Sequence, residues 1–208
     1  MIKAVVFDYG KVICLAPSAE NRAALAALTG VPPETLDALD REYRQDYDRG
    51  EMSGREYYRL LLGKAGIVVD DPALDRIVAV DAEGWKLINP GTAALMRDVK
   101  KAGLALGILS NMPHEFLSWV RNNVPLLGEA DVAVFSCEAR SVKPETAIYE
   151  RLRAALGCAF GEIVFFDDIP DNVQKAAELG IHGVLWSGCE EAREMLAKID
   201  RRFPVVPD

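Results

Sequence analysis

The chain has 208 residues, a formal net charge of −8 at pH 7 and a pI near 4.9. Half of its residues are apolar and 27% are charged, which is typical of a folded globular protein with one sizeable core and room for a smaller appended domain. The acidic balance argues against a nucleic-acid partner or an anionic membrane surface, because both attract broad positive potential.

The cysteines and the apolar stretches favour a cytoplasmic protein. Cys14, Cys137, Cys158 and Cys189 are far apart and form no CxxC pair, which argues against a zinc site or a disulfide framework, so we expect reduced and mostly buried thiols. No stretch has the apolar length of a transmembrane helix, and the N-terminus enters a strand without a signal-peptide pattern. We therefore expect neither secretion nor membrane insertion.

The first predicted element is a buried strand that ends at an acid. The apolar run Ala4-Val5-Val6-Phe7 stops at Asp8, and Gly10 follows shortly after. Open α/β sheets keep their chemistry at the carboxyl ends of such strands. Alone, an aspartate in this position is more often a turn former or a helix N-cap, so Asp8 needs support from the rest of the chain.

Residues 16 to 87 change to a helical composition with no credible strand. The predicted helices are 18–28, ending at Gly30; one from Pro33 towards Tyr47; one from Ser53, with Glu56 in the capping-box position, through Leu62; and one from Asp71-Pro72. We predict that 16–87 is a small all-helical domain inserted into a core domain formed by 1–15 and 88–208.

From Asn89 onward the predicted elements alternate. A helix through Lys101 and the strand 104–109 are followed by a helix near 115–122, the strand 131–135, a helix over 144–156, a strand ending at Asp167, a further helix and a short strand over 182–186. This alternation predicts an α/β fold with a doubly wound, mostly parallel, Rossmann-like sheet.

Four polar clusters follow strands of this predicted sheet: Asp8, Ser110-Asn111, Lys143-Pro144 and Asp167-Asp168. Because the carboxyl ends of parallel strands share one edge, we expect the clusters to converge. Three carboxylates that lie so near to one another require a cation. The alternatives are a solvated surface lysine at Lys143 and a simple helix cap at Ser110-Asn111.

The residue types complement one another for phosphoryl transfer. Asp8 is ionised at pH 7 and can attack phosphorus as a nucleophile, while Lys143 would neutralise phosphate oxygens. Ser110 and the backbone N–H groups after Asp8 would donate hydrogen bonds to the substrate. The expected catalytic residues are Asp8 and Lys143, and the expected substrate-binding residues are Tyr9, Gly10, Ser110, Asn111 and Lys143.

A magnesium ion is the expected cofactor. It prefers oxygen ligands, and these would come from Asp8, Asp167, Asp168 and the Gly10 carbonyl. Asp171 and Asn172 are plausible helix caps, with Asn172 also placed to orient the metal-binding carboxylates.

The order of the motifs resembles one family, the haloacid dehalogenase-like hydrolases. The matching segments are FDYGKV at the first strand, LSN at the second, VKPETAIY, and FFDDIPDN followed by AAELGI. The resemblance covers nearly the whole chain, including a helical cap after the first motif. It implies a magnesium-dependent phosphatase site on Asp8, Ser110, Lys143, Asp167 and Asp168.

The sequence departs from the common pattern of this family at Gly10. Most phosphatases of the family carry an aspartate there as general acid and base. The chain is similar to a branch with a DxGxV first motif that includes sugar phosphatases such as α-D-glucose-1-phosphate phosphatase, down to GEMS in the cap and SNMPHEF after the second motif. The leaving group must then take its proton from water, from the cap or from the substrate.

We therefore expect a magnesium-dependent phosphatase that hydrolyses a small phosphorylated metabolite, such as a sugar phosphate, through an aspartyl-phosphate intermediate, as a monomer or homodimer. The alternatives are a 2-haloacid dehalogenase and a catalytically weak binding or regulatory protein with the same fold. At the end of the second cap helix, the expected candidates for reading the leaving group are Arg44, Asp46, Tyr47, Asp48 and Arg49.

Overall fold

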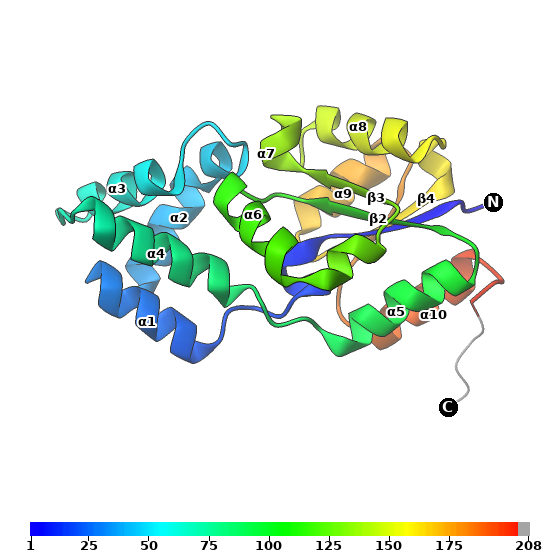
Figure 1. Cartoon of the computed structure of the whole chain (residues 1–208). Helices are drawn as coiled ribbons and strands as arrows, with labels where there is room; N and C mark the ends of the chain where they lie inside the picture. The colour runs from blue at the N-terminus through cyan, green and yellow to red at the C-terminus, as the bar shows by residue number, and fades with distance from the viewer. Residues whose placement is uncertain (204–208) are drawn as a thin grey trace.

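The structure, a computed structural model, describes residues 1–203. Figure 1 shows a group of helices on the left and a sheet flanked by helices on the right. The strands are β1 (Ala4–Phe7), β2 (Ala105–Ser110), β3 (Val132–Phe135), β4 (Ile163–Asp167) and β5 (His182–Leu185). The left-hand helices are α1 (Ala19–Thr29), α2 (Pro33–Asp48), α3 (Gly54–Lys64) and α4 (Asp71–Gly84).

The remaining helices flank the sheet or connect its strands. They are α5 (Pro90–Lys101), α6 (His114–Asn123), α7 (Ser136–Ala139), α8 (Thr146–Leu156), α9 (Pro170–Glu178) and α10 (Cys189–Ile199). Three short helical turns complete the elements: η1 (Tyr9–Ile13), η2 (Pro125–Glu129) and η3 (Phe160–Glu162).

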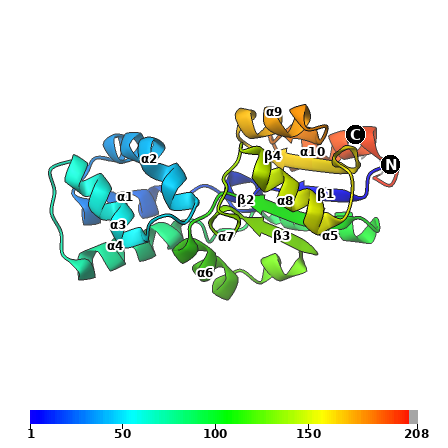
Figure 2. The same ribbon diagram turned by 90° about the horizontal axis from the view of Figure 1, so that it is seen from above.

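The sheet has the order β3-β2-β1-β4-β5, and every neighbouring pair is parallel. The chain winds from β1 through β2 to β3 and then crosses back to β4, so the winding direction reverses beside β1. In such a sheet the crevice at this reversal, outside the carboxyl ends of the strands, is where ligands bind. Figure 2 shows β1 running towards α1–α4, which lie beyond this edge of the sheet.

Each face of the sheet packs against its own helices. Val5 and Phe7 of β1 belong to a core that includes Leu95 of α5 and Leu196 of α10. The alternate residues of β1 pack on the other face, with α8 and α9. In Figure 1, α8 lies above the sheet and α5 and α10 lie below it. Because both faces are covered, β1 is apolar throughout and Asp8 is the first polar residue after it.

The four helices α1–α4 have a separate hydrophobic core, which includes the aromatic side chains of Tyr47 and Tyr57. These two rings stack with centroids 4.3 Å apart. The unit, which we call the cap, is joined to the core by two chain crossings that pair with each other: the Leu15 N–H donates to the Leu87 carbonyl at 2.7 Å. This pairing restrains the directions in which the cap can move.

The cap is also held to the core by polar contacts around the end of α2. The Ser136 hydroxyl donates to the Asp48 carbonyl at 2.5 Å, and Arg49 pairs with Glu145 at 2.6 Å. The Gly54 N–H, at the start of α3, donates to Glu115 of α6 at 2.7 Å. The segment between α2 and α3 is therefore anchored on the core at several points.

The predicted α/β fold with a parallel sheet is confirmed, and the predicted elements are present with small shifts at their ends. The strand predicted over 104–109 begins at Ala105 and includes Ser110, and the last strand ends at Leu185. Helix α10 was not predicted, although Ala192 and Leu196 form its buried side. The exact division into domains, 16–87 against 1–15 and 88–208, stays a prediction.

The predicted burial of the cysteines agrees with the structure. All four are free thiols; Cys14, Cys137 and Cys158 are buried and Cys189 is partly buried. No helix within residues 1–203 combines the length and the apolar character that crossing a membrane requires.

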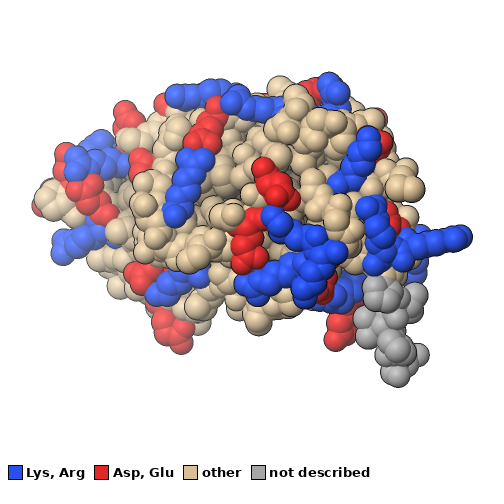
Figure 3. Space-filling view, turned by 45° about the vertical axis from the view of Figure 1, so that its right-hand side comes forward, with Lys and Arg blue, Asp and Glu red and all other residues tan. Residues whose placement is uncertain are grey.

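The charges on one face are mixed in sign. Figure 3 shows Lys and Arg side chains next to Asp and Glu. Along α5, Arg97 pairs with Glu129 at 3.1 Å and Lys100 pairs with Asp131 at 2.8 Å. Neighbouring acids therefore offset part of the positive charge of α5.

Asn89 caps α5 where the second chain crossing returns to the core, and this capping can be tested. Its Oδ1 accepts the Gly91 N–H at 3.0 Å. We expect Asn89→Ala to lower the free energy of unfolding by about 1 kcal/mol, because the cap bond is lost. Asn89→Gly should lower the free energy of unfolding by only a few tenths of a kcal/mol, since glycine is a good N-cap residue.

Urea denaturation measures both changes. Asn122→Ala, at an exposed position of α6, is the control and should have little effect. Equal destabilisation by Asn89→Ala and Asn89→Gly would contradict the capping role.

Candidate active site

A buried lysine bridges two strand ends at the centre of the site. The Nζ of Lys143 lies 2.8 Å from Asp8 Oδ1 and 2.7 Å from Asp167 Oδ2, and it donates to the Leu109 carbonyl at 2.9 Å. Lys143 is 3% exposed, Asp8 6% and Asp167 0%. These contacts use the three N–H donors of the ammonium group, so Lys143 is a fixed positive charge between the two carboxylates.

Burial and neighbouring charges decide the ionisation of this group. Burial, opposed by Lys143 and assisted by the charge of Asp167, raises the pKa of Asp8 to about 7. Burial lowers the pKa of Lys143, but the two carboxylates outweigh it and the pKa is raised, so Lys143 keeps its charge. The Tyr9 N–H donates to Asp8 Oδ1 at 2.7 Å, and within residues 1–203 no protein donor binds Asp8 Oδ2.

Asp167 has both carboxylate oxygens occupied by protein donors. Its Oδ1 accepts the Ile169 N–H at 2.8 Å and the Asn172 amide at 3.0 Å. Its Oδ2 accepts Lys143 and, at 3.1 Å, the same Asn172 amide. Asn172 therefore orients a carboxylate of the acidic cluster, the role considered for it from the sequence.

Asp8, Asp167 and Asp168 are brought together as predicted. Each offers one carboxylate oxygen, and these three atoms lie within 4.8 Å of one another. Asp168 is partly exposed and pairs with Lys11 at 3.3 Å. The donor set consists of hard oxygen atoms beside an open cavity, which fits a magnesium ion. The carboxylate oxygens of Asp8 and Asp168 accept fewer bonds from protein donors than those of Asp167, so they are freer to bind a metal ion.

Ser110 and Asn111 lie beside Lys143, at the end of β2. The Asn111 Oδ1 accepts the Lys143 N–H at 2.8 Å, and its Nδ2 donates to the Lys143 carbonyl at 3.0 Å. The Ser110 hydroxyl makes only a long contact, 3.5 Å, with the Asn111 carbonyl. Asn111 thus holds the backbone of the lysine, while Ser110 remains available to a ligand in the cavity.

Tyr9 and Gly10 differ in how they meet the cap. The Tyr9 side chain is buried, and its hydroxyl donates to the Trp85 carbonyl at 3.1 Å. Gly10 has φ −65° and ψ 125°, a backbone conformation open to any residue. A Cβ at this position would meet Trp85 Cζ3 at 3.6 Å, an ordinary contact. Backbone geometry and Cβ packing thus do not explain the absence of a side chain at Gly10.

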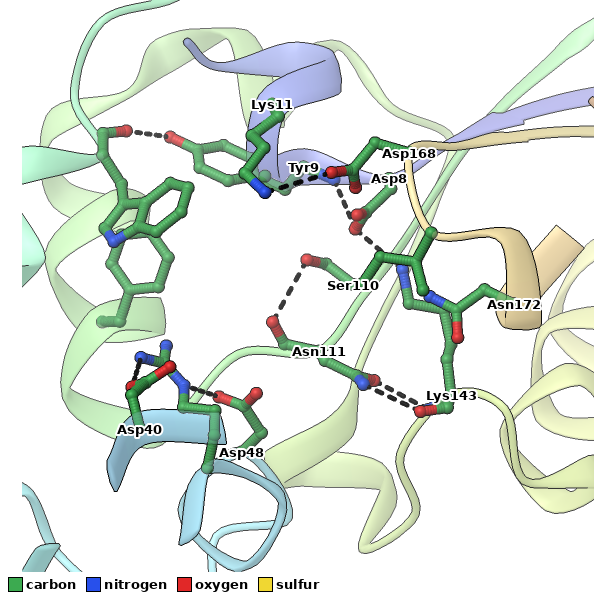
Figure 4. Close-up of a pocket in the computed structure, with 15 residues that line it drawn as sticks. Asp8, Tyr9, Lys11, Asp40, Asp48, Ser110, Asn111, Lys143, Asp168 and Asn172 are labelled. Atoms are coloured by element: carbon green, nitrogen blue, oxygen red, sulfur yellow. Dashed lines mark hydrogen bonds and ion pairs between the residues drawn. The ribbon is translucent and has the colours of Figure 1, made fainter. Parts of the chain in front are cut away.

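A cavity of about 210 Å³ separates this group from the cap (Figure 4). Its core side is lined by Asp8, Tyr9, Gly10, Lys11, Ser110, Asn111, Phe116, Lys143, Asp168, Ile169 and Asn172. Its cap side is lined by Asp40, Arg44, Asp48 and Trp85. All the predicted core site residues except Asp167 line the cavity, and Asp167 lies directly behind Lys143.

Only part of the predicted cap group reaches the cavity. Arg44 and Asp48 line it, whereas Tyr47 stacks on Tyr57 and Arg49 pairs with Glu145. Asp46 is exposed and is not among the lining residues. Lining residues that sequence reasoning missed are Lys11, Asp40, Trp85, Phe116 and Ile169. Asp40 lies one helical turn before Arg44, and that spacing was the available signal.

The chain is similar in sequence to known proteins. The family model described as haloacid dehalogenase-like hydrolase matches residues 2–180. Phosphatase MT3486 of Mycobacterium tuberculosis is 24% identical over 206 residues, covering 93% of this chain and 91% of that protein. The (S)-2-haloacid dehalogenase of Pseudomonas putida is also 24% identical, over 195 residues, covering 86% of this chain and 82% of that protein.

Solved structures share the fold. The wild-type HAD family enzyme bt-2542 of Bacteroides thetaiotaomicron, in complex with magnesium and inorganic phosphate, matches with a TM-score of 0.67 and 20% sequence identity. The match covers 90% of this chain and 98% of that one.

The buried lysine gives the site a measurable effect on stability. We expect Lys143→Met to lower the free energy of unfolding by about 3–5 kcal/mol in a buffer with EDTA, because two buried carboxylates lose their shared cation. Urea denaturation of the variant measures this.

The control is Lys175→Met, which removes a surface lysine paired with Glu178 at 3.0 Å and should change stability little. Equal stabilities of the two variants would show that Lys143 does not compensate buried charge.

Proposed function

Because the chain belongs to the haloacid dehalogenase-like hydrolases, we propose that it is a magnesium-dependent phosphatase acting on a small phosphorylated metabolite, with sugar phosphates as the first class to test. The observation that carries the proposal is the buried Asp8 beside Lys143, with Asp168 close by, at the wall of the cavity between core and cap. A cavity of about 210 Å³ suits a small substrate.

Asp8 would act as the nucleophile. Its carboxylate attacks the phosphorus of the bound ester, the bond to the leaving oxygen breaks, and water then hydrolyses the resulting acyl phosphate. Lys143 orients Asp8 and offsets negative charge at the point of attack. The Ser110 hydroxyl and the backbone N–H groups of η1 would hold the phosphate oxygens.

The acidic group would hold the metal ion. Asp8 and Asp168 supply carboxylate oxygens, Gly10 is proposed to supply its carbonyl, and Asp167 keeps Lys143 and Asn172 in place. When bound, magnesium would offset the charge of the phosphate and orient it. The bt-2542 complex with magnesium and inorganic phosphate and the similarity to phosphatase MT3486 support this assignment.

A dehalogenase is the second candidate, favoured by the similarity to the (S)-2-haloacid dehalogenase of Pseudomonas putida. In that reaction an aspartate would attack carbon and displace halide, with no need for a cation. Asp168 would then lie beside Asp8 with no cation to bind, and its charge would disfavour an anionic haloacid. The three adjacent carboxylates therefore favour the phosphatase.

A metal test separates the two candidates. We expect hydrolysis of 4-nitrophenyl phosphate and of sugar phosphates to require magnesium and to stop in excess EDTA, because the carboxylate cluster needs a cation to admit a phosphate. Phosphate release and halide release from 2-chloropropionate are measured in parallel. Halide release with no phosphatase activity would reverse the assignment.

A second test concerns the nucleophile. Asp8→Asn should fold as the wild type does and retain less than about 1% of its turnover, because an amide cannot form the acyl phosphate. Thermal denaturation checks the fold and a phosphate-release assay measures turnover. Asp46→Asn, at an exposed position of the cap, is the matched control and should keep full activity. Substantial turnover by Asp8→Asn would exclude the covalent route.

A further inference from the structure

The proposed reaction benefits from a proton donor for the leaving oxygen, and among residues 1–203 the core side of the cavity offers no acid free for this task. Asp8 is the nucleophile, Asp167 has both oxygens occupied, and Asp168 belongs to the acidic cluster proposed to bind the magnesium ion. Gly10 has no side chain. A protein group that donates this proton would therefore lie on the other wall of the cavity.

We infer that Asp48 of the cap is the general acid and base of the reaction. The inference rests on the proposed phosphatase function. Asp48 is the last residue of α2, lines the cavity and is 7% exposed. Figure 4 shows it on the cap side, with Asp8 on the core side. A leaving group that extends from a phosphate at Asp8 into the cavity would lie between them.

Hydrogen bonds fix the position of Asp48 relative to the core. Its carbonyl accepts the Ser136 hydroxyl at 2.5 Å. The same hydroxyl oxygen accepts the Met112 N–H at 2.8 Å, two residues after Ser110. One hydrogen-bonded chain therefore connects Asp48 to the end of β2, and the acid is fixed relative to the proposed phosphate site although it belongs to the cap.

The charges around Asp48 favour a group that can hold and release a proton. Its Oδ1 accepts Arg44 Nε at 2.8 Å, and within residues 1–203 no protein donor binds its Oδ2. The charged groups that face it are Arg44 and Asp40 on α2 and Asp81 on α4. One arginine thus faces three carboxylates. Burial raises the pKa of Asp48, Arg44 opposes this, and the charges of Asp40 and Asp81 add to it.

Asp40 is a poorer candidate for the same role. Its side chain is 41% exposed, and its Oδ1 already accepts the Tyr57 hydroxyl and Arg44. Arg44 can stabilise the carboxylate of Asp48 once the proton has left.

The proton balance closes over the two steps. As Asp8 attacks phosphorus, the bond from phosphorus to the leaving oxygen breaks, and that oxygen takes the proton of Asp48, giving an alcohol, an aspartyl phosphate and an Asp48 carboxylate. Water then attacks phosphorus and gives one proton to Asp48. The bond from phosphorus to Asp8 breaks, inorganic phosphate forms, and both aspartates return to their starting states.

Leaving-group dependence tests this role. The purified full chain with magnesium is assayed on 4-nitrophenyl, phenyl and benzyl phosphate, whose leaving groups become progressively less acidic. We expect Asp48→Asn to lower kcat/KM for benzyl phosphate by about 10²–10⁴-fold, because that leaving group depends on an acid. The loss for 4-nitrophenyl phosphate should be less than about threefold, because nitrophenolate leaves unprotonated.

A pH profile gives an independent readout. The wild-type kcat/KM for benzyl phosphate should fall as pH rises and Asp48 loses its proton, and this fall should be absent from Asp48→Asn. Asp46→Asn, two residues away and exposed, is the control and should match the wild type on all three substrates.

The outcomes separate the inference from the function on which it rests. The role of Asp48 would be overturned if Asp48→Asn lost activity equally on all three esters or lost none. It would also be overturned if the wild-type rate decreased from 4-nitrophenyl to benzyl phosphate as steeply as the rate of Asp48→Asn. Absence of hydrolysis of any ester by the magnesium-loaded wild type would overturn the phosphatase proposal and the inference with it.

Discussion

The buried charge of Lys143 is the constraint on which the rest of the site depends. A lysine that is 3% exposed is tolerated only if carboxylates and a carbonyl surround its ammonium group, and those partners lie just after β1, in β2 and in β4. The order of the strands, with β1 between β2 and β4, brings the partners together. The sheet therefore has a hydrophobic core on both faces, and its charged side chains lie together at the carboxyl ends of the strands.

The cap completes the site by closing the space above this charge. Two paired chain crossings and the contacts of Ser136, Glu115 and Glu145 keep the end of α2 against the core. In the proposed mechanism, the cap and a bound substrate together would limit the access of water to the cavity and so strengthen the electrostatic interactions inside it. The cap side of the cavity is polar on α2 and aromatic at Trp85, so in the proposed mechanism it would contact the group that carries the phosphate.

Core and cap thus have separate chemical tasks in the proposed mechanism. The core supplies the nucleophile, a fixed positive charge and the oxygen ligands for a cation, and these serve the phosphate whatever the leaving group is. Gly10 leaves the core without the acid that most phosphatases of the family carry beside the nucleophile. In the inferred mechanism a cap residue, Asp48, transfers the proton instead, so proton transfer and substrate recognition depend on the same few side chains.

The sequence alone predicted the α/β fold, the parallel sheet and the convergence of Asp8, Ser110, Lys143 and Asp168, because strand and helix periodicities are local and parallel strands share one carboxyl edge. It did not predict α10, nor that Asp40, Trp85 and Phe116 line the cavity. Those assignments depend on the docking of α2 and α4 against the core, which involves contacts between residues far apart in the chain. Tertiary structure also decided that Asn111 holds the Lys143 backbone and that Asp167 is saturated, since each bond needs a partner that no local pattern identifies.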